Sequence, residues 1–179
     1  MLVGITGGTG TRKTVIAKRL QAAHGFERLH AGQPVKTAVA EGFDLNARET
    51  TGKGKDRPTQ KLGGATFRNA TEAFGAGIHA IAPQATAAAL SKRIMPLLVK
   101  GKSVAVDGVR SPTEAEAIRK MGGQIWRADN GKPVNQHQPM DKKQATVDHD
   151  AVIDTKSDDK KTIRANVDAQ MLKCFGVGS

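Results

Sequence analysis

Short apolar runs alternate with longer segments of helical periodicity along almost the whole chain. The runs have the length of strands and fall at residues 2–6, 26–31, 103–108, 124–128 and 151–154, with 2–6 expected to be buried and 26–31 the weaker signal. Segments with the spacing of helices lie between and after them, at 15–25, 34–43, 67–75, 83–101, 111–123 and 157–176. This alternation predicts a single-domain α/β fold over residues 1–179, with about five parallel strands flanked by helices.

The helix expected over 111–123 has the clearest terminal signals in the sequence. Ser111 can cap its first turn, and Pro112 suits the first helical position. Glu114, three residues after Ser111, completes the pattern of a capping box. Gly122 can end the helix, because glycine adopts the left-handed conformation that follows many helices.

The apolar positions favour a core of aliphatic side chains rather than aromatic ones. Hydrophobic residues make up 38% of the chain, which has five Phe, one Trp and no Tyr. The last expected helix, 157–176, contributes one apolar stripe to this core. Its members are Ile163, Val167, Met171 and Cys174.

Two polar segments interrupt the alternation of strands and helices. Residues 46–66 are basic and rich in Gly and Thr, and a second loop is expected at 129–148. Long loops inside a compact domain are often functional, so 46–66 is a candidate mobile lid or substrate loop. The alternative is a solvated surface loop without a role.

The charge balance favours a polyanionic partner. The chain has 28 Lys and Arg against 17 Asp and Glu, which gives a formal net charge of +11. Nucleotides, nucleic acids and membrane surfaces suit such a charge, and solvated basic loops are the alternative. The basic run at 48–61 lacks the aromatic residues that stack on single-stranded bases, which argues against nucleic acid.

The compartment is predicted from the cysteine content and the apolar runs. Cys174 stands alone, which excludes an internal disulfide and suits a reducing environment. The apolar start is too short for a signal peptide, and no run has the length of a membrane span. We expect a cytoplasmic protein with no membrane partner, and the sequence leaves its oligomeric state open, a homodimer included.

The histidines give no sign of a metal site or of a hydrolase. No cysteine or carboxylate accompanies them at the spacing of metal ligands, and no G-x-S-x-G motif is present. The histidines are His24, His30, His79, His137 and His149.

The strongest chemical signal is GGTGTRKT at residues 7–14. It follows an expected strand and opens an expected helix, which is the setting of a phosphate-binding loop with the pattern G-x-x-x-x-G-K-[ST]. In such a loop Lys13 would reach the β- and γ-phosphates of ATP, and the Thr14 hydroxyl would bind Mg²⁺. The candidate nucleotide-binding residues are Gly7, Gly8, Thr9, Gly10, Thr11, Arg12, Lys13, Thr14 and Val15.

Arg12 departs from this pattern, because it stands where the second glycine belongs. Its side chain would crowd the loop and weaken binding, swing outward, or contact phosphate itself. The sequence does not choose among these outcomes. A glycine-rich turn that binds no ligand is the remaining alternative for residues 7–14.

Asp107 is the candidate carboxylate of the same site. It ends the expected strand over 103–108, and open α/β sheets bind ligands at the carboxyl ends of their strands. A carboxylate there can hold Mg²⁺ directly or through water. Aspartate at a strand end is also a common turn former.

The segment VAVDGVRSPTEAEAIRKMGGQIWRAD, residues 104–129, resembles phage-type deoxynucleoside monophosphate kinases. In that family a strand ends at D-V-R-F-P-N-E-A-E-A-I, and a Gly-Gly turn leads to a V-W-R strand. The matching residues are Val109, Arg110, Pro112, Glu114, Ala115, Glu116, Ala117, Ile118, Gly122, Gly123, Trp126 and Arg127.

Three other segments resemble the same family in the same order along the chain. They are 31–43 for F-A-D-P-L-K, 65–75 for T-P-R-x-L-L-Q-x-L-G and 150–163 for D-x-V-I-x-N-x-G-S-L-x-x-L. The matching residues are Pro34, Lys36, Thr66, Arg68, Gly75, Asp150, Val152 and Ile153. The resemblance thus spans nearly the whole chain.

The resemblance implies a P-loop kinase that transfers the γ-phosphoryl group of ATP to a nucleoside or deoxynucleoside monophosphate, with ATP and Mg²⁺ as cofactors. It makes Lys13, Arg110 and Asp107 the candidate catalytic residues, and Thr14 and Asp107 the metal ligands. The acceptor phosphate would be bound by cationic side chains, for each of which a surface ion pair is the alternative. These are Lys36, Arg68, Arg110 and Arg127.

Several positions differ from the family where loops are expected to touch ligand. The family's D-V-R acid aligns with Gly108, and the aspartate of A-D-P-L-K is replaced by Gln33. Of H-x-S-E only His137 is kept, and the tail asparagine is Thr155. With Arg12, these differences predict a changed substrate, a changed site or reduced activity.

Two other functions stay open. The opening GITGGTGTRKTVIAK, residues 4–18, also resembles dephospho-coenzyme A kinases, which makes another small-molecule P-loop kinase the nearer alternative. The more distant one is a non-catalytic basic protein that binds polyanions through a degenerate loop, with steep salt dependence.

Overall fold

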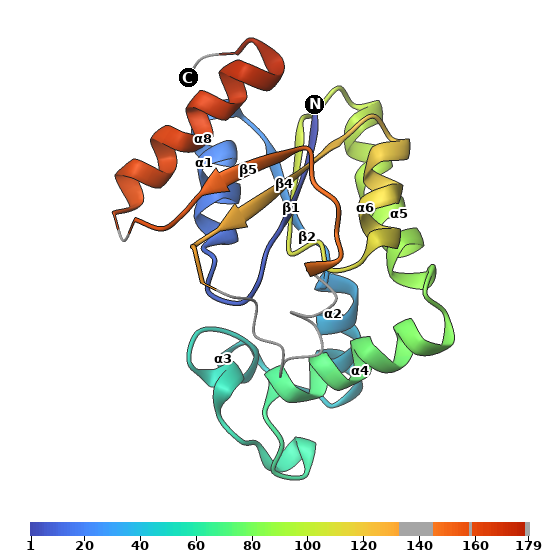
Figure 1. Cartoon of the computed structure of the whole chain (residues 1–179). Coiled ribbons are helices and arrows are strands. Elements are labelled where there is room, and N and C mark those ends of the chain that lie inside the picture. The colour runs from blue at the N-terminus through green and yellow to red at the C-terminus, as the bar shows by residue number, and fades with distance from the viewer. Residues whose placement is uncertain (133–144, 158, 178–179) are drawn as a thin grey trace. The chain divides into compact units, whose positions relative to one another are not determined.

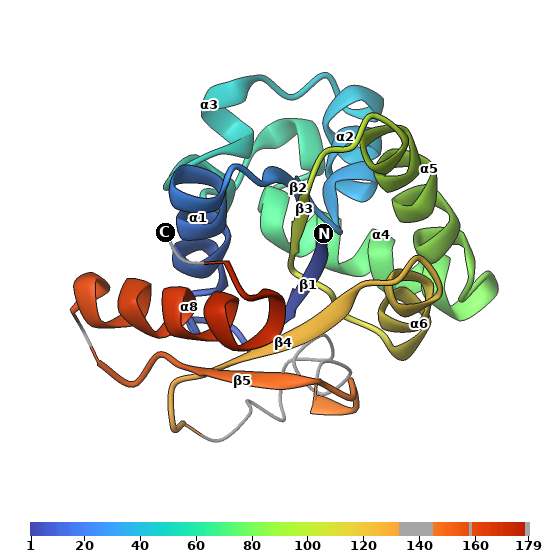
Figure 2. The same cartoon turned by 90° about the horizontal axis from the view of Figure 1, so that it is seen from above.

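Five short parallel strands form one sheet in the computed structural model of the chain, which describes residues 1–132, 145–157 and 159–177. The strands are β1 (Leu2–Thr6), β2 (Glu27–His30), β3 (Val104–Asp107), β4 (Gln124–Asp129) and β5 (Ala151–Asp154). They lie in the order β2-β3-β1-β4-β5, which can be followed in Figure 2, and Figure 1 shows the same sheet from the side. Since β1 lies between β3 and β4, the loop that follows β1 leaves the middle of the sheet at its carboxyl edge.

The chain divides into two compact units, of which the first combines Met1–Ala31 with Leu90–Ser179 and the second is Gly32–Ala89. The first unit contains the sheet with α1 (Lys13–His24), α6 (Pro112–Lys120) and α8 (Lys160–Phe175), and most of α5 (Ala85–Val99). The second contains α2 (Gln33–Gly42), α3 (Ala47–Thr50) and α4 (Phe67–Ile81).

Helices cover both faces of the sheet in the first unit (Figures 1 and 2). Successive side chains of β1 enter opposite layers: Val3 and Ile5 join one core cluster, and Leu2 joins the other. Helices α1 and α8 fill the first cluster with Ile16, Ala17, Leu20, Ile163, Val167 and Met171. Helices α5 and α6 fill the second with Leu90, Ile94, Ala115 and Ile118. The predicted α/β class, with a five-stranded parallel sheet flanked by helices, is confirmed.

The core is aliphatic, as the composition predicts, with two aromatic exceptions in the first unit. Trp126 and Phe26 are both buried in the layer under α1 and α8. Three members of the stripe predicted for the last helix, Ile163, Val167 and Met171, are buried, whereas Cys174 is only partly buried. 

The predicted start of α6 is confirmed in part. The Ser111 side chain accepts a hydrogen bond from the Glu114 backbone N–H at 3.3 Å, and Pro112 is the first helical residue. The Glu114 carboxylate, however, accepts from the backbone N–H of Arg110 at 2.7 Å instead of completing a capping box with Ser111. It therefore fixes the backbone of the loop that precedes the helix.

The second unit has local structure where the sequence indicated a long loop. Within 46–66 lie α3, a 3₁₀ turn at Gly54–Asp56 and another at Gln60–Leu62. Asn46 and Glu49 form a capping box around α3, a short-range signal that sequence inspection had not registered. Helix α4 extends to Ile81, beyond the predicted end at 75.

Most of the loop predicted over 129–148, with His137, lies outside the described residues. Among the residues that are described, no helix is both long enough and apolar enough to cross a membrane.

Candidate functional site

The residues of GGTGTRKT connect β1 to the first turn of α1, as the motif predicts. Gly7 has φ 134°, and a Cβ atom there would lie 2.7 Å from the Ala128 carbonyl oxygen, so only glycine fits. Further along, the Thr11 hydroxyl donates a hydrogen bond to the Gly8 carbonyl oxygen at 2.9 Å. These two features hold the loop in a tight turn at the carboxyl edge of the sheet.

Lys13 lies over this turn. Its Nζ donates hydrogen bonds to the carbonyl oxygens of Gly7 and Gly8, the latter at 2.6 Å. The backbone of residues 7–8 therefore holds the ammonium group against the turn. A phosphate bound in the loop would meet this charge together with the positive end of the α1 dipole.

Arg12 occupies a left-handed backbone conformation, with φ 63° and ψ 25°, at the residue that precedes α1. Glycine adopts this conformation without strain, which gives a physical reason for glycine in the motif. The arginine side chain turns to the connection between β5 and α8, where Nη1 donates to the Ser157 carbonyl oxygen at 2.8 Å. The sequence left three outcomes open for the Arg12 side chain: crowding the loop, swinging outward or contacting phosphate. In the structure the side chain is swung outward.

A second hydrogen bond joins the loop to the same connection. The Thr155 hydroxyl donates to the Thr11 carbonyl oxygen at 3.1 Å, and Thr155 is 1% exposed. Arg12 and Thr155 are both positions at which the sequence differs from the kinases that it resembles. In the fold they lie at one junction, between the phosphate loop and the start of the β5–α8 connection.

Thr14 and Val15 begin α1 and have different surroundings. Thr14 is exposed in the first turn, so its hydroxyl is accessible to a ligand. Val15 is partly buried and packs against the core under α1 and α8. Its predicted contact with the nucleotide stays a prediction.

Asp107 ends β3, and its carboxylate is 2% exposed. Arg28 on the neighbouring strand donates to Oδ2 through Nε at 3.0 Å and through Nη2 at 2.5 Å. The other oxygen, Oδ1, lies 3.6 Å from His30 Nε2, beyond hydrogen-bond distance, and accepts no hydrogen bond from the described residues. Arg28 thus neutralises one carboxylate oxygen, and the other is buried without a hydrogen bond from the described residues.

Sequence reasoning missed Arg28 and His30 as neighbours of Asp107. They are two positions apart on β2, so both side chains point to the same face, and His30 pairs in register with Asp107. The sequence does show that Arg28 and His30 are two positions apart in the strand expected at 26–31, which puts both side chains on one face. Because nothing in the sequence says which strand lies beside β3, the ion pair became visible only in the fold.

Mg²⁺ prefers oxygen ligands and binds proteins through one or two carboxylates together with substrate phosphates and water. The unsatisfied Oδ1 of Asp107 and the accessible hydroxyl of Thr14 are oxygen donors of the kind such an ion needs. Within the described residues, no group of three or more His, Cys, Asp or Glu side chains forms a metal site.

The four residues predicted to bind the acceptor belong to different units. Arg110 and Arg127 are in the first unit: Arg110 follows β3, and Arg127 lies on β4 beside Thr6 of β1. Lys36 on α2 and Arg68 on α4 belong to the second unit. 

Arg68 forms an ion pair with Asp56, with Nε 2.5 Å from Oδ1. The hydrogen bond from Arg68 lowers the pKa of Asp56, and the same bond raises the pKa of Arg68. The surface ion pair that was the alternative for Arg68 is thus present in this structure. An acceptor phosphate would have to replace Asp56 as the partner of this guanidinium.

No protein-family model matches the chain, and no curated protein sequence matches it. Solved structures do resemble the fold. An unliganded sugar kinase from Janibacter sp. HTCC2649 is similar over 99% of this chain and 98% of its own, with a TM-score of 0.55 and 14% identity. A dephospho-CoA kinase from Campylobacter jejuni is similar over 96% of both chains, with a TM-score of 0.53 and 11% identity. At these identities the likeness shows a shared α/β fold and leaves the activity to the site.

Proposed function

We propose that the protein transfers the γ-phosphoryl group of ATP to a small-molecule acceptor, which we assign as a nucleoside or deoxynucleoside monophosphate. The observation that carries this proposal is the loop of residues 7–14. It keeps a tight turn with Lys13 over it, although Arg12 replaces a motif glycine. Because the Arg12 side chain is bonded to Ser157, the substitution does not by itself obstruct the turn.

Catalysis of phosphoryl transfer depends on positioning and on charge stabilisation, and the loop supplies both. Its backbone N–H groups and the start of α1 would orient the polyphosphate, while Lys13 would exchange its carbonyl partners for the β- and γ-phosphate oxygens. Mg²⁺ held by Thr14 and Asp107 would neutralise phosphate charge. Arg28 fixes Asp107 through Oδ2, so that Oδ1 keeps one orientation.

The acceptor assignment depends on the family resemblance. A monophosphate brings a second dianion to the site, and guanidinium groups bind such groups in a bidentate manner. By this resemblance Arg68, Arg110 and Arg127 would bind the acceptor phosphate or the transferring group, and Lys36 would serve the acceptor.

The test is ADP release from Mg²⁺–ATP by the native chain and by the Lys13→Ala variant. Acceptors are the common nucleoside and deoxynucleoside monophosphates, with dephospho-coenzyme A and a simple sugar as the other arms. The matched control is Lys102→Ala, which removes an exposed lysine just before β3, at the opposite end of the strands. Circular dichroism and thermal unfolding show whether each variant is folded.

Turnover that needs a monophosphate, persists in Lys102→Ala and falls at least about a hundredfold in Lys13→Ala supports the proposal. Turnover only with dephospho-coenzyme A or the sugar keeps the phosphoryl transfer and overturns the acceptor. No turnover with any acceptor, in a folded native protein, overturns the enzyme assignment. That outcome favours a polyanion-binding protein with a degenerate loop.

A further inference from the structure

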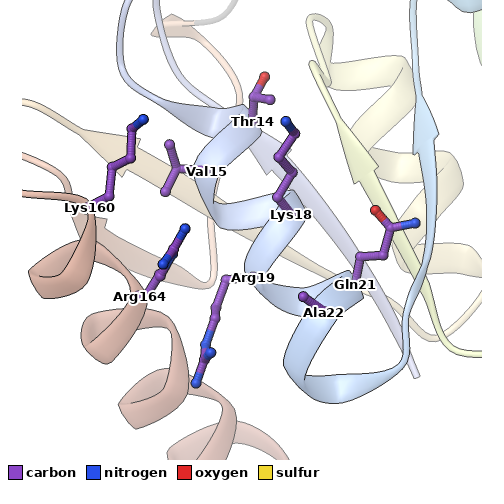
Figure 3. Close-up of a pocket in the computed structure, with 8 residues that line it drawn as sticks. All are labelled: Thr14, Val15, Lys18, Arg19, Gln21, Ala22, Lys160 and Arg164. Carbon is purple, nitrogen blue, oxygen red and sulfur yellow. The ribbon is translucent and has the colours of Figure 1, made fainter.

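A cavity of about 700 Å³ lies between α1 and α8, beside the phosphate loop and within the first unit. Figure 3 shows its lining: Lys18 and Arg19 project from α1, and Lys160 and Arg164 project from the first turns of α8. Thr14, the last residue of the loop motif, lies at one end. The remaining lining residues are Val15, Gln21 and Ala22.

The cavity has a net positive charge. Arg19 is neutralised by Asp168, with Nη2 2.5 Å from Oδ2. Lys18, Lys160 and Arg164 form no ion pair with any carboxylate in the part of the chain that the structure describes, and no acidic residue lines the cavity. An anion in the cavity would therefore meet three cationic side chains from two helices.

The carboxylate of Asp159 is close in sequence to these cations, but the start of α8 uses it. Asp159 caps the helix and accepts hydrogen bonds from the backbone N–H groups of Lys161 and Thr162. The hydrogen bond from the Lys161 backbone is the main cause of its lowered pKa, and the charge of Arg164 adds to it. Asp159 therefore lowers the positive charge near the cavity but is not among the residues that line it.

The size and lining of the cavity indicate the kind of anion. Its volume lies within the roughly 300–1,000 Å³ of small-molecule sites. No aromatic side chain is among the lining residues, so the stacking that holds single-stranded nucleic acid is absent from the cavity wall. Lysine and arginine on two helices instead suit several phosphate groups at once.

We propose that this cavity is a second phosphate site, which binds a small polyphosphate-bearing ligand separately from the loop of residues 7–14. The ligand is a free polyphosphate or the polyphosphate chain of a nucleotide. This inference does not depend on the proposed kinase activity, because Lys160 and Arg164 have no part in that reaction. Thr14 lines the cavity and also belongs to the loop, so occupation of one site changes the electrostatic field at the other.

The experiment uses the full-length Lys13→Ala protein, in which the loop has lost its lysine. Inorganic tripolyphosphate is titrated into it at low ionic strength by isothermal titration calorimetry, without Mg²⁺. We expect one tripolyphosphate per chain, with an affinity that falls steeply as salt is added. A parallel titration with ATP distinguishes the two sources: equal affinity indicates that the phosphates alone are bound, and tighter binding of ATP indicates a nucleotide.

Two double variants in the same background locate the site. Lys160→Gln with Arg164→Gln removes two cavity cations, and we expect tripolyphosphate affinity to fall at least about tenfold. Lys161→Gln with Lys173→Gln removes the same charge from α8 at exposed residues outside the cavity lining. This control is expected to change the affinity less than about twofold.

Two results would overturn the inference. If the Lys13→Ala protein binds no tripolyphosphate, the cavity is not a site separate from the loop. If both double variants weaken binding equally, the anion responds to net charge and not to this cavity. Neither result bears on the proposed reaction, which is tested by ADP release in the protein that keeps Lys13.

Discussion

The guanidinium of Arg12 donates a hydrogen bond to the Ser157 carbonyl oxygen at 2.8 Å, although the two residues are 145 positions apart in the chain. One end of this contact is the residue that breaks the phosphate-loop pattern, and the other lies between β5 and α8. The unusual residue of the motif therefore joins the loop to a distant segment. Its backbone, at φ 63°, keeps the conformation for which glycine is normally required.

Replacing Arg12 by glycine should leave ATP binding nearly unchanged. Glycine removes a left-handed strain of about 1 kcal/mol, while the contact with Ser157 is lost, so the two effects on stability oppose each other. Arg12→Val should instead lower the free energy of unfolding by about 1–2 kcal/mol and weaken ATP binding, because a β-branched residue disfavours positive φ. Equilibrium titration with Mg²⁺–ATP and thermal unfolding check both variants. Equal ATP affinity in the valine and glycine variants would contradict the importance of this backbone conformation.

The buried hydroxyl of Thr155 should contribute to the same junction. Thr155→Val keeps the shape of the side chain but leaves the Thr11 carbonyl without this donor, at a cost of about 1–2 kcal/mol in the free energy of unfolding. Thr155→Ser retains the hydroxyl and is the matched control, expected to lose less. Urea denaturation measures the difference. If serine and valine have the same effect, the hydrogen bond is not what stabilises the junction.

Gly7 and Gly10 form a matched pair for testing the loop. Both have positive φ, but a Cβ atom at Gly7 would lie 2.7 Å from a backbone oxygen, whereas one at Gly10 meets nothing within 4 Å. Gly7→Ala should therefore lower the free energy of unfolding by about 2–4 kcal/mol, and Gly10→Ala by only about 1 kcal/mol. Thermal unfolding compares them directly. Equal losses would mean that the contact with the Ala128 carbonyl does not restrict this position.

The ion pair of Arg28 with the buried Asp107 should cost more stability when one partner is removed than when both are replaced. Arg28→Met leaves the carboxylate without its cation, which should lower the free energy of unfolding by about 3 kcal/mol. In the double variant Arg28→Met with Asp107→Leu, no charge remains to be desolvated, so at least half of that loss should be recovered. Denaturant unfolding of Arg28→Met, of Asp107→Leu and of the double variant gives the coupling energy. Strictly additive losses would contradict the pairing.

Asp168 should make stability depend on acid pH. The hydrogen bond from Arg19 is the main cause of its lowered pKa, and the hydrogen bond from His24 adds to it. Because the pKa is lower in the folded chain, the stabilisation is present in full above the unfolded value of about 3.9 and is lost as pH falls through the folded value. Asp168→Asn should be less stable than the native chain at pH 7, by about 1 kcal/mol, and this difference should shrink below about pH 4.

Unfolding by urea at several pH values measures this dependence. The control is Glu116→Gln, which removes one partner of the exposed pair with Lys120 on α6 and should leave stability nearly unchanged. A difference between Asp168→Asn and the native chain that stays constant down to pH 2 would show that the carboxylate acts through packing rather than charge.

The sequence determined the local elements of this protein and their order. Segments with the length of strands predicted all five strands of the sheet. Burial on both faces gives β1 and β3 their mainly apolar sequences, whereas the edge strands β2 and β5 are partly exposed. The motif at residues 7–14 placed the turn between β1 and α1 correctly, because strand, turn and helix follow one another directly in the sequence, although α1 begins at Lys13, two residues before the predicted start. Ser111 and Pro112 marked the start of α6 for the same reason.

Only the tertiary structure decided the relations between residues far apart in the chain. The direction of the Arg12 side chain, the partners of Asp107 and the cationic cavity between α1 and α8 all bring together segments that no local pattern connects. Strand order is the physical reason: until β2 lies beside β3, and β5 leads into α8 beside α1, these side chains have no defined neighbours.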